Sequence, residues 1–177
     1  MNRKIIITGT TCTGKTTLGK QISKAFKIPQ IDLDDIHFLP NWVEKENSVF
    51  VKDVITETNK YQEWIVTGSY QSILKDTIRQ EATLIVWLDY PLNLILRRYF
   101  IRTYKRVFLK EKCCGENYET LGTTFSKESL FLWIFKTYWH RKRRMADWKE
   151  NLFSHKEWLI LKKPNEAKKL RTYLYDN

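Results

Sequence analysis

Short apolar runs alternate along the chain with longer stretches in which apolar residues recur every three or four positions. Short runs are typical of buried strands, and the longer periodic stretches are typical of amphipathic helices. The expected strands are KIIIT at 4–8, PQIDLD at 29–34, WIVTG at 64–68, LIVWLD at 84–89 and EWLILK at 157–162. Continuous apolar strands separated by helices predict an α/β fold of three layers, in which helices cover both faces of a five-stranded parallel sheet.

The helical periodicity also predicts which side chains face the core. The inward residues expected in the helix at 16–26 are Leu18, Ile22 and Phe26. Those expected in the helix at 48–61 are Val51, Val54 and Ile55. A helix is expected at 92–106, and the longest helix, at 126–153, has a stripe formed by Phe131, Ile134, Tyr138, Arg141, Met145, Trp148 and Leu152.

The segment ITGTTCTGKTT at 7–17 contains Gly9, four residues, then Gly14-Lys15-Thr16, which is the P-loop pattern. It follows an expected strand and opens an expected helix, so its backbone N–H groups and the helix N-terminus predict a phosphate-binding loop in a P-loop NTPase fold. Lys15 is expected to bridge the β- and γ-phosphates of ATP, and the Thr16 hydroxyl to bind Mg²⁺. The residues expected to contact ATP are Gly9, Thr10, Thr11, Cys12, Thr13, Gly14, Lys15, Thr16 and Thr17.

Ligands of parallel sheets gather at the carboxyl ends of the strands, which predicts one edge carrying residues 9–17, 32–35, 67–70 and Asp89. The segment IDLDDIHFLPNW at 31–42 resembles the nucleoside-monophosphate, gluconate and shikimate kinase group of P-loop proteins, and Asp32-Leu33-Asp34 matches the Asp-x-Asp of shikimate-type kinases. The resemblance implies that Asp32 holds Mg²⁺ through water. It also implies that Asp34 accepts the proton or a hydrogen bond of an acceptor hydroxyl.

Neighbouring residues leave alternatives open. Asp35 is either a helix cap or a further acid of the site, and His37 and Trp42 either pack in the core or contact a substrate. Tyr70 is a candidate acceptor contact. Asp89 is either the cap of the helix that begins near Pro91 or a metal ligand.

The third strand ends in Thr67-Gly68, where adenylate-kinase-like proteins usually have Asp-Gly. Because Thr67 cannot supply a negative charge to the Mg²⁺ shell, we expect Asp32 to take this role, as in shikimate-type kinases. Gly68 is expected to let the backbone approach the acceptor closely.

The net charge is +11, and residues 97–144 contain 13 Lys or Arg against 4 Asp or Glu. Arg98 and Arg102 lie one helical turn apart, which resembles the start of the lid in adenylate-kinase-type enzymes. The resemblance implies a lid at about 103–125, and the absence of CxxC spacing predicts that it holds no metal. Arg141 interrupts an apolar stripe and needs an anionic partner, for which phosphate is the expected choice.

The motifs LDDIHFLPNW, WIVTGSY, VWLDYP, WHRKRR and LKKPNEAKKL, taken with the P-loop, resemble bacterial topology-modulation proteins, which are related to adenylate kinase. The kinase group implies that Pro164, Asn165 and Glu166 border the adenine. The expected function is an ATP-dependent kinase that transfers the γ-phosphate to a hydroxyl or phosphate acceptor. The alternative is an ATP-binding, DNA-associated regulatory protein, which the basic segment at 97–144 favours.

Length and composition set the remaining expectations. A chain of 177 residues predicts a single P-loop kinase-like domain over 1–177. The three cysteines, Cys12, Cys113 and Cys114, have no metal spacing and predict reduced thiols in a cytoplasmic protein. The longest apolar run, LFLWIF at 130–135, is far shorter than a membrane span, so no membrane is expected among the partners.

Overall fold

The computed structural model describes residues 2–110, 117 and 130–176. Its strands are β1 (Lys4–Gly9), β2 (Gln30–Asp32), β3 (Trp64–Thr67), β4 (Leu84–Leu88) and β5 (Glu157–Leu161). They form one parallel sheet in the order β2-β3-β1-β4-β5, so the P-loop strand lies at its centre. The predicted α/β fold with a five-stranded parallel sheet is confirmed.

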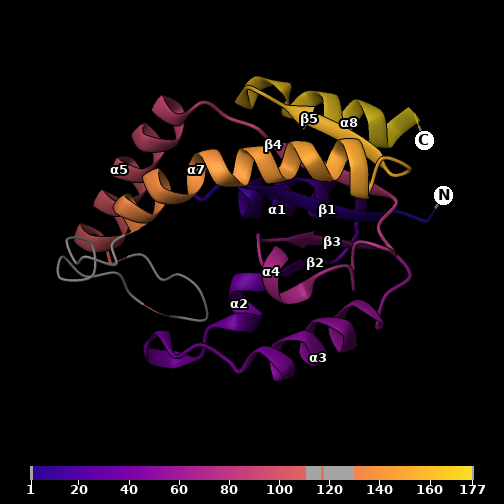
Figure 1. The fold of residues 1–177 in the computed structure, drawn as a ribbon, viewed down its shortest axis with the longest axis horizontal. Helices are drawn as coiled ribbons and strands as arrows, with labels where there is room; N and C mark the ends of the chain where they lie inside the picture. Colours follow the sequence, from indigo (N-terminus) through magenta and orange to yellow (C-terminus); the bar gives the residue numbers. More distant parts are fainter. Residues whose placement is uncertain (1, 111–116, 118–129, 177) are drawn as a thin grey trace.

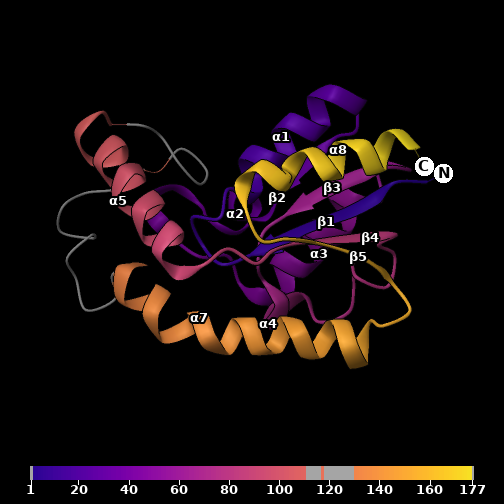
Figure 2. The ribbon, with the colours of Figure 1, turned by 90° about the horizontal axis from the view of Figure 1, so that it is seen from above.

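The helices are α1 (Lys15–Phe26), α2 (Leu33–His37), α3 (Asn47–Thr58), α4 (Gln71–Leu74), α5 (Leu92–Phe108), α7 (Leu130–Asp147) and α8 (Ala167–Asp176). Shorter helical turns are η1 (Pro40–Trp42), the π-helical turn η2 (Trp148–Leu152) and η3 (Pro164–Glu166). Helices α1 and α8 cover one side of the sheet, and α7 lies on the opposite side (Figures 1 and 2). Helix α5 lies beyond the carboxyl ends of the strands, at the edge where ligands are expected.

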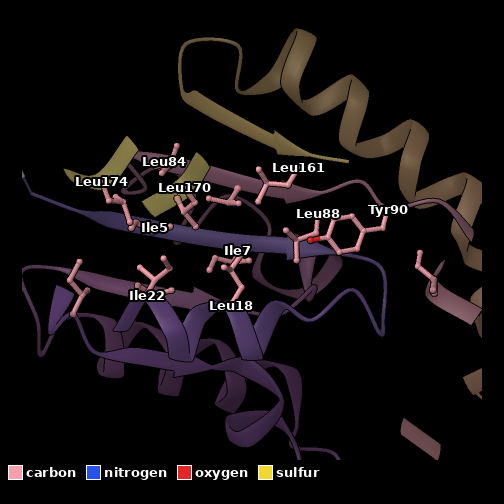
Figure 3. Packing of buried hydrophobic residues seen from close by; sticks show 14 of the residues in the cluster. Ile5, Ile7, Leu18, Ile22, Leu84, Leu88, Tyr90, Leu161, Leu170 and Leu174 are labelled. Carbon is pink, nitrogen blue, oxygen red and sulfur yellow. The ribbon is translucent and has the colours of Figure 1, made fainter. Parts of the chain in front are cut away.

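The core has two parts because alternate residues of β1 face opposite sides of the sheet. Ile5 and Ile7 pack against one set of helices, whereas Ile6 packs on the other face with Phe50 and Val54 of α3. Figure 3 shows the first part, with side chains from α1 and α8 directed at β1: Leu18, Ile22, Leu170 and Leu174.

Three expectations about these elements are wrong in detail. Strand β2 ends at Asp32, and Asp34 belongs to α2, because the Asp32 side chain accepts a hydrogen bond from the Asp34 N–H at 3.3 Å and caps that helix. Asp35 is therefore not the cap. In α3 Val54 is buried as predicted and Val51 packs against the same core, but the other buried residues are Phe50 and Thr58 rather than Ile55.

The stripe predicted for the long helix is interrupted at its end. Ile134, Tyr138 and Met145 of α7 are buried, but Leu152 is 49% exposed. The chain passes through the π-helical turn η2 before it reaches Leu152, and the wider turn changes which residues face the sheet.

The predicted lid lies mostly outside the described residues. Its first residues, 103–108, continue α5, and within the rest only Leu109, Lys110 and Asn117 are described. The buried Asn117 side chain accepts from the Trp42 N–H at 3.0 Å and donates to the Leu39 carbonyl at 3.1 Å. This residue therefore joins the segment after α5 to the turn after α2. Among the helices of the described residues, none is long and apolar enough to cross a membrane.

Replacing Gly19 of α1 tests how closely this helix packs on β3. Alanine normally stabilises a helix interior by about 1 kcal/mol relative to glycine. Here an added Cβ would lie 2.6 Å from Cγ2 of the buried Thr67. We expect Gly19→Ala to lower the free energy of unfolding in urea by about 1–3 kcal/mol. Lys20→Ala, on the exposed side of the same helix, is the matched control, and a Gly19→Ala protein as stable as that control would contradict the packing.

Candidate active site

The P-loop connects β1 to α1 and is held in one shape by its own hydrogen bonds. The Thr10 carbonyl accepts from the Thr13 hydroxyl at 2.7 Å and from the Lys15 ammonium at 3.1 Å. Glycine is required at both ends of the loop. Gly9 has φ 153° and a Cβ there would lie 2.9 Å from the Leu88 carbonyl, and Gly14 has φ 89°.

Two residues that the sequence analysis did not single out brace the start of this loop. The Ser69 hydroxyl donates to the Gly9 carbonyl at 2.7 Å, and the Gln71 amide donates to the Thr8 hydroxyl at 2.9 Å. Both follow β3, the neighbour of β1 in the sheet. Their polar side chains next to a strand end were the available signal, but their partners lie about sixty residues away in the sequence.

A cavity of about 500 Å³, here called the P-loop cavity, opens over the loop. Arg98 lies at its wall, where its guanidinium donates to the Thr13 carbonyl at 2.6 Å and sits 5.2 Å from the ring centre of Tyr90. Pro164, which was expected to border an adenine, also lines it. The residues that line this cavity from the loop and α1 are Thr11, Cys12, Thr13, Gly14, Lys15, Thr16, Thr17, Leu18 and Gln21.

A second cavity of about 490 Å³, here called the α2 cavity, lies beside the first. Its wall is rich in rings, which come from His37, Phe38, Trp42, Tyr70 and Trp133. The two cavities share five lining residues: Thr11, Lys15, Asp34, Arg102 and Arg106. The structure thus brings the P-loop lysine and the second aspartate of the Asp-x-Asp motif to the place where two cavities meet.

The charges around Lys15 act on its pKa. Burial lowers the pKa of Lys15, the charge of Asp34 opposes this change, and the charge of Arg141 adds to it. The Tyr70 hydroxyl donates to the Asp34 carboxylate at 2.7 Å, which fixes the direction of that carboxylate. Tyr70 therefore lies at the candidate site, and its contact with an acceptor stays a prediction.

His37 packs in the core, which is one of the two interpretations that the sequence left open, and its contact with a substrate stays a prediction. Its ring is buried against Phe50 and Tyr70, with ring centres 4.8 and 4.6 Å apart, and it also lines the α2 cavity. Its Nε2 lies 3.7 Å from a carboxylate oxygen of Glu44.

Asp32 and Thr16 form a pair beneath the loop. Burial raises the pKa of Asp32, whereas a hydrogen bond from the Thr16 side chain lowers it. One hydroxyl and one carboxylate suit Mg²⁺, which keeps several of its waters and needs few protein ligands. In the part of the chain that the structure describes, no group of three or more His, Cys, Asp or Glu side chains is arranged to hold a metal.

Thr67 is the last residue of β3, and Gly68 follows it. Thr67 is fully buried between the sheet and α1, where its hydroxyl accepts a hydrogen bond from the Gln30 amide at 3.0 Å. Gly68 was expected to give an acceptor close access to the backbone. A Cβ there would instead lie 2.7 Å from Cβ of Leu33, so the glycine lets α2 pack against the end of β3.

Arg141 of α7 lies in the α2 cavity with its guanidinium 4.2 Å from a ring centre of Trp133. Burial, followed by the charge of Arg144, lowers the pKa of Arg141 to about 10, although Tyr70 and Asp34 act to raise it. The group therefore stays charged at neutral pH. Its place in the apolar stripe is explained in part by the indole ring, which accepts the cation on its face.

Asp89 is not the helix cap that its position suggested. The residue at the N-cap of α5 is Pro91, and no side chain caps that helix. The Asp89 carboxylate instead forms an ion pair with Lys142 of α7 at 2.9 Å.

The comparisons with known proteins agree with this architecture. No family model and no curated protein match the sequence. Among solved structures, shikimate kinase from Bacteroides thetaiotaomicron is 17% identical with a TM-score of 0.56 over 98% of both chains. Shikimate kinase from Aquifex aeolicus is 16% identical with a TM-score of 0.50 over 98% of this chain and 97% of that one.

A gluconokinase from Sinorhizobium meliloti is 21% identical, with a TM-score of 0.43 over 58% of this chain and 66% of its own. The likeness to the two shikimate kinases shows that this chain has their P-loop α/β fold. The expected relation to topology-modulation proteins stays a prediction.

The buried carboxylate of Asp32 predicts a pH-dependent gain in stability when its charge is removed. Because the folded state raises the pKa of Asp32, ionising it costs more in the folded than in the unfolded chain. This cost is absent near pH 3, where the group is protonated in both states, and is complete at pH 8. Asparagine caps a helix as well as aspartate does. In EDTA, Asp32→Asn should therefore melt at a higher temperature than the unsubstituted protein at pH 8, with the difference closing toward pH 3.

The matched control is Asp35→Asn, which removes the same charge from an exposed position of α2. An equal rise in both variants would point to relief of repulsion among the neighbouring acids Asp32, Asp34 and Asp35 rather than to burial. A lower melting temperature for Asp32→Asn at pH 8 would contradict the assigned burial.

Proposed function

We propose that this chain is an ATP-dependent phosphotransferase, which binds ATP in the P-loop cavity and a small-molecule acceptor in the α2 cavity. The observation that carries the proposal is the junction of the two cavities at Lys15 and Asp34. A transfer site needs a donor and an acceptor to meet at one point while both remain held. The fold shared with two shikimate kinases supports the same class of reaction.

On the donor side, the backbone N–H groups of the P-loop and the N-terminus of α1 bind the phosphates. Lys15 neutralises the β- and γ-phosphates, and Arg98 stands at the wall of the same cavity. Thr16 and Asp32 would hold Mg²⁺, Asp32 through water, and the ion supplies charge neutralisation of the triphosphate. Cys12 and Thr17 line the cavity without a specific chemical role.

On the acceptor side, Asp34 accepts the proton of the acceptor hydroxyl, and Tyr70 keeps its carboxylate pointed into the site. The hydroxyl oxygen forms a bond to the γ-phosphorus while the bond from that phosphorus to the bridging oxygen breaks. The products are a phosphate ester, ADP and a proton on Asp34, which is then released to water.

Positive charge surrounds the point of transfer. Arg102 and Arg106 line both cavities, and Arg141 enters from the acceptor side. Such groups stabilise the charge that spreads over the γ-phosphoryl oxygens during transfer. These three arginines line the α2 cavity together with only two acids, Asp34 and Glu44. The excess of positive charge favours an acceptor that itself carries negative charge.

The alternative of a DNA-associated protein rests on the basic segment at 97–144. Several of its arginines line the two cavities: Arg98, Arg102, Arg106 and Arg141. Because these arginines line the cavities, their position supports binding of small phosphorylated ligands. Nucleic-acid binding stays a prediction of the sequence.

The acceptor can be found by thermal melting in ADP and Mg²⁺ against a panel of hydroxylated small molecules, both anionic and neutral. A ligand that binds the native state at a hundred times its Kd stabilises it by about 2.7 kcal/mol. We expect an anionic compound to raise the melting temperature and to accelerate ADP release from ATP. If nucleotide gives no shift, or if no compound accelerates ADP release while DNA binds with a steep salt dependence, the phosphotransferase proposal fails.

Arg141→Ala separates a phosphate contact from a structural role. We expect acceptor-dependent ADP release to fall by about a thousandfold or more. The melting temperature should change by no more than a few degrees. Arg143→Ala, on the exposed side of the same helix, should have nearly unchanged turnover. Equal losses of activity and stability in Arg141→Ala would show that the arginine is structural.

A further inference from the structure

Two consecutive residues after β4, Asp89 and Tyr90, contact both of the helices that carry arginines into the site. We propose that they form a shared seat for Arg98 of α5 and Arg141 of α7. In this role Asp89, Tyr90 and Lys142 are positioning residues, which act on phosphate only through the two arginines. The inference rests on the proposed function, since it takes both arginines to be phosphate contacts.

On the α5 side, the ring of Tyr90 contacts the guanidinium of Arg98 and positions it. The ring is buried beside Leu88 at the end of β4, as Figure 3 shows. The Arg98 guanidinium lies 5.2 Å from its centre and donates to the Thr13 carbonyl at 2.6 Å. A cation over an aromatic face has a defined position, so the ring and the loop carbonyl together fix Arg98 at the wall of the P-loop cavity.

On the α7 side, the Tyr90 carbonyl and the Asp89 carboxylate hold the helix in place. The Tyr138 hydroxyl donates to the Tyr90 carbonyl at 3.2 Å, and the Lys142 ammonium pairs with Asp89 at 2.9 Å. Tyr138 and Lys142 are four residues apart and so lie on one face of the helix. Arg141 lies within the turn that these two contacts hold.

The next turn of α7 extends the same attachment. The Gln71 amide lies 3.9 Å from the Met145 sulfur and donates to the Thr8 hydroxyl in β1. Leu88 is paired with Gly9 in the sheet, so Asp89 and Tyr90 follow directly beside the start of the P-loop. The distance from the loop to both arginines is therefore set by one strand end rather than by the helices alone.

The ion pair also bears on the other role open to Asp89. An aspartate after the strand next to the P-loop strand is placed where a metal ligand could stand, but here its carboxylate faces an ammonium on α7. The two roles give opposite expectations for Lys142. If Asp89 positions the arginines, removing either Asp89 or Lys142 weakens their contacts to phosphate. If Asp89 binds a metal, removing Lys142 frees its carboxylate for that metal.

The test compares the Kd of the β,γ-imido analogue of ATP with the Kd of ADP, both with Mg²⁺, by calorimetry. The ratio reports contacts to the third phosphate and needs no acceptor. We expect the unsubstituted protein to favour the analogue. Asp89→Asn and Lys142→Gln should each reduce this preference by about tenfold, the worth of a lost charge-assisted contact, and leave the Kd of ADP within about twofold.

Two further variants separate positioning from a general loss of structure. The double variant Asp89→Asn/Lys142→Gln should be no worse than either single variant, because both remove one interaction. Lys142→Arg should retain most of the preference, since it keeps the ion pair. Lys136→Gln, an exposed lysine on α7, is the control for lost charge and should have the unsubstituted ratio.

Each other outcome overturns the inference in a distinguishable way. An unchanged ratio in both single variants means that the ion pair does not position Arg141. A weakened Mg²⁺ dependence in Asp89→Asn alone, with Lys142→Gln normal, assigns Asp89 to the metal. If the unsubstituted protein binds the analogue and ADP with equal affinity, the arginines do not contact the third phosphate and the inference fails. If it binds neither nucleotide, the proposed function itself fails.

Discussion

The site depends on the ammonium group of Lys15, which is partly withdrawn from water where the two cavities meet. This burial lowers the pKa of Lys15, and the ammonium donates a hydrogen bond to the Thr10 carbonyl within the loop. A buried cation is costly unless an anion lies near it, and Asp34 supplies part of this compensation. Arg141 adds a second positive charge that works against Lys15. A phosphate group between the two cations would relieve this repulsion, which is why the arrangement favours a phosphorylated ligand over an uncharged one.

The parallel sheet explains why the groups of the site come from several elements. The carboxyl ends of β1, β2 and β4 bring the loop, Asp32 and Asp89 to one edge of the sheet. Helices α5 and α7 then extend beyond this edge and supply the arginines (Figures 1 and 2). The acids therefore stand on or next to the sheet, and the cations stand on helices whose positions depend on contacts such as Lys142 with Asp89. Phosphate binding would join these two groups of elements.

The sequence predicted the parts of this site that local rules govern. The P-loop has fixed glycine positions because its backbone must bend, and apolar strands are visible without knowing their partners. Tertiary packing and capping decide three features that were not predicted: the burial of Phe50 and Thr58 in α3, the π-helical turn before Leu152 and the helix that carries Asp34. Asp89 had two local interpretations, and its actual partner, Lys142, lies 53 residues further along the chain. Gly68 was assigned to the acceptor because nothing in its own segment shows that Leu33 packs against it.

The central claim is that phosphate passes between the two cavities at Lys15 and Asp34. A crystal structure with Mg²⁺ and a non-hydrolysable ATP analogue tests it most directly. The account predicts that the loop from Gly9 to Thr16 encloses the triphosphate, with the terminal phosphate against Lys15 and Arg141 and with Asp34 facing it from the α2 cavity. A triphosphate bound elsewhere, or a terminal phosphate from which both Arg141 and Asp34 are turned away, would contradict it.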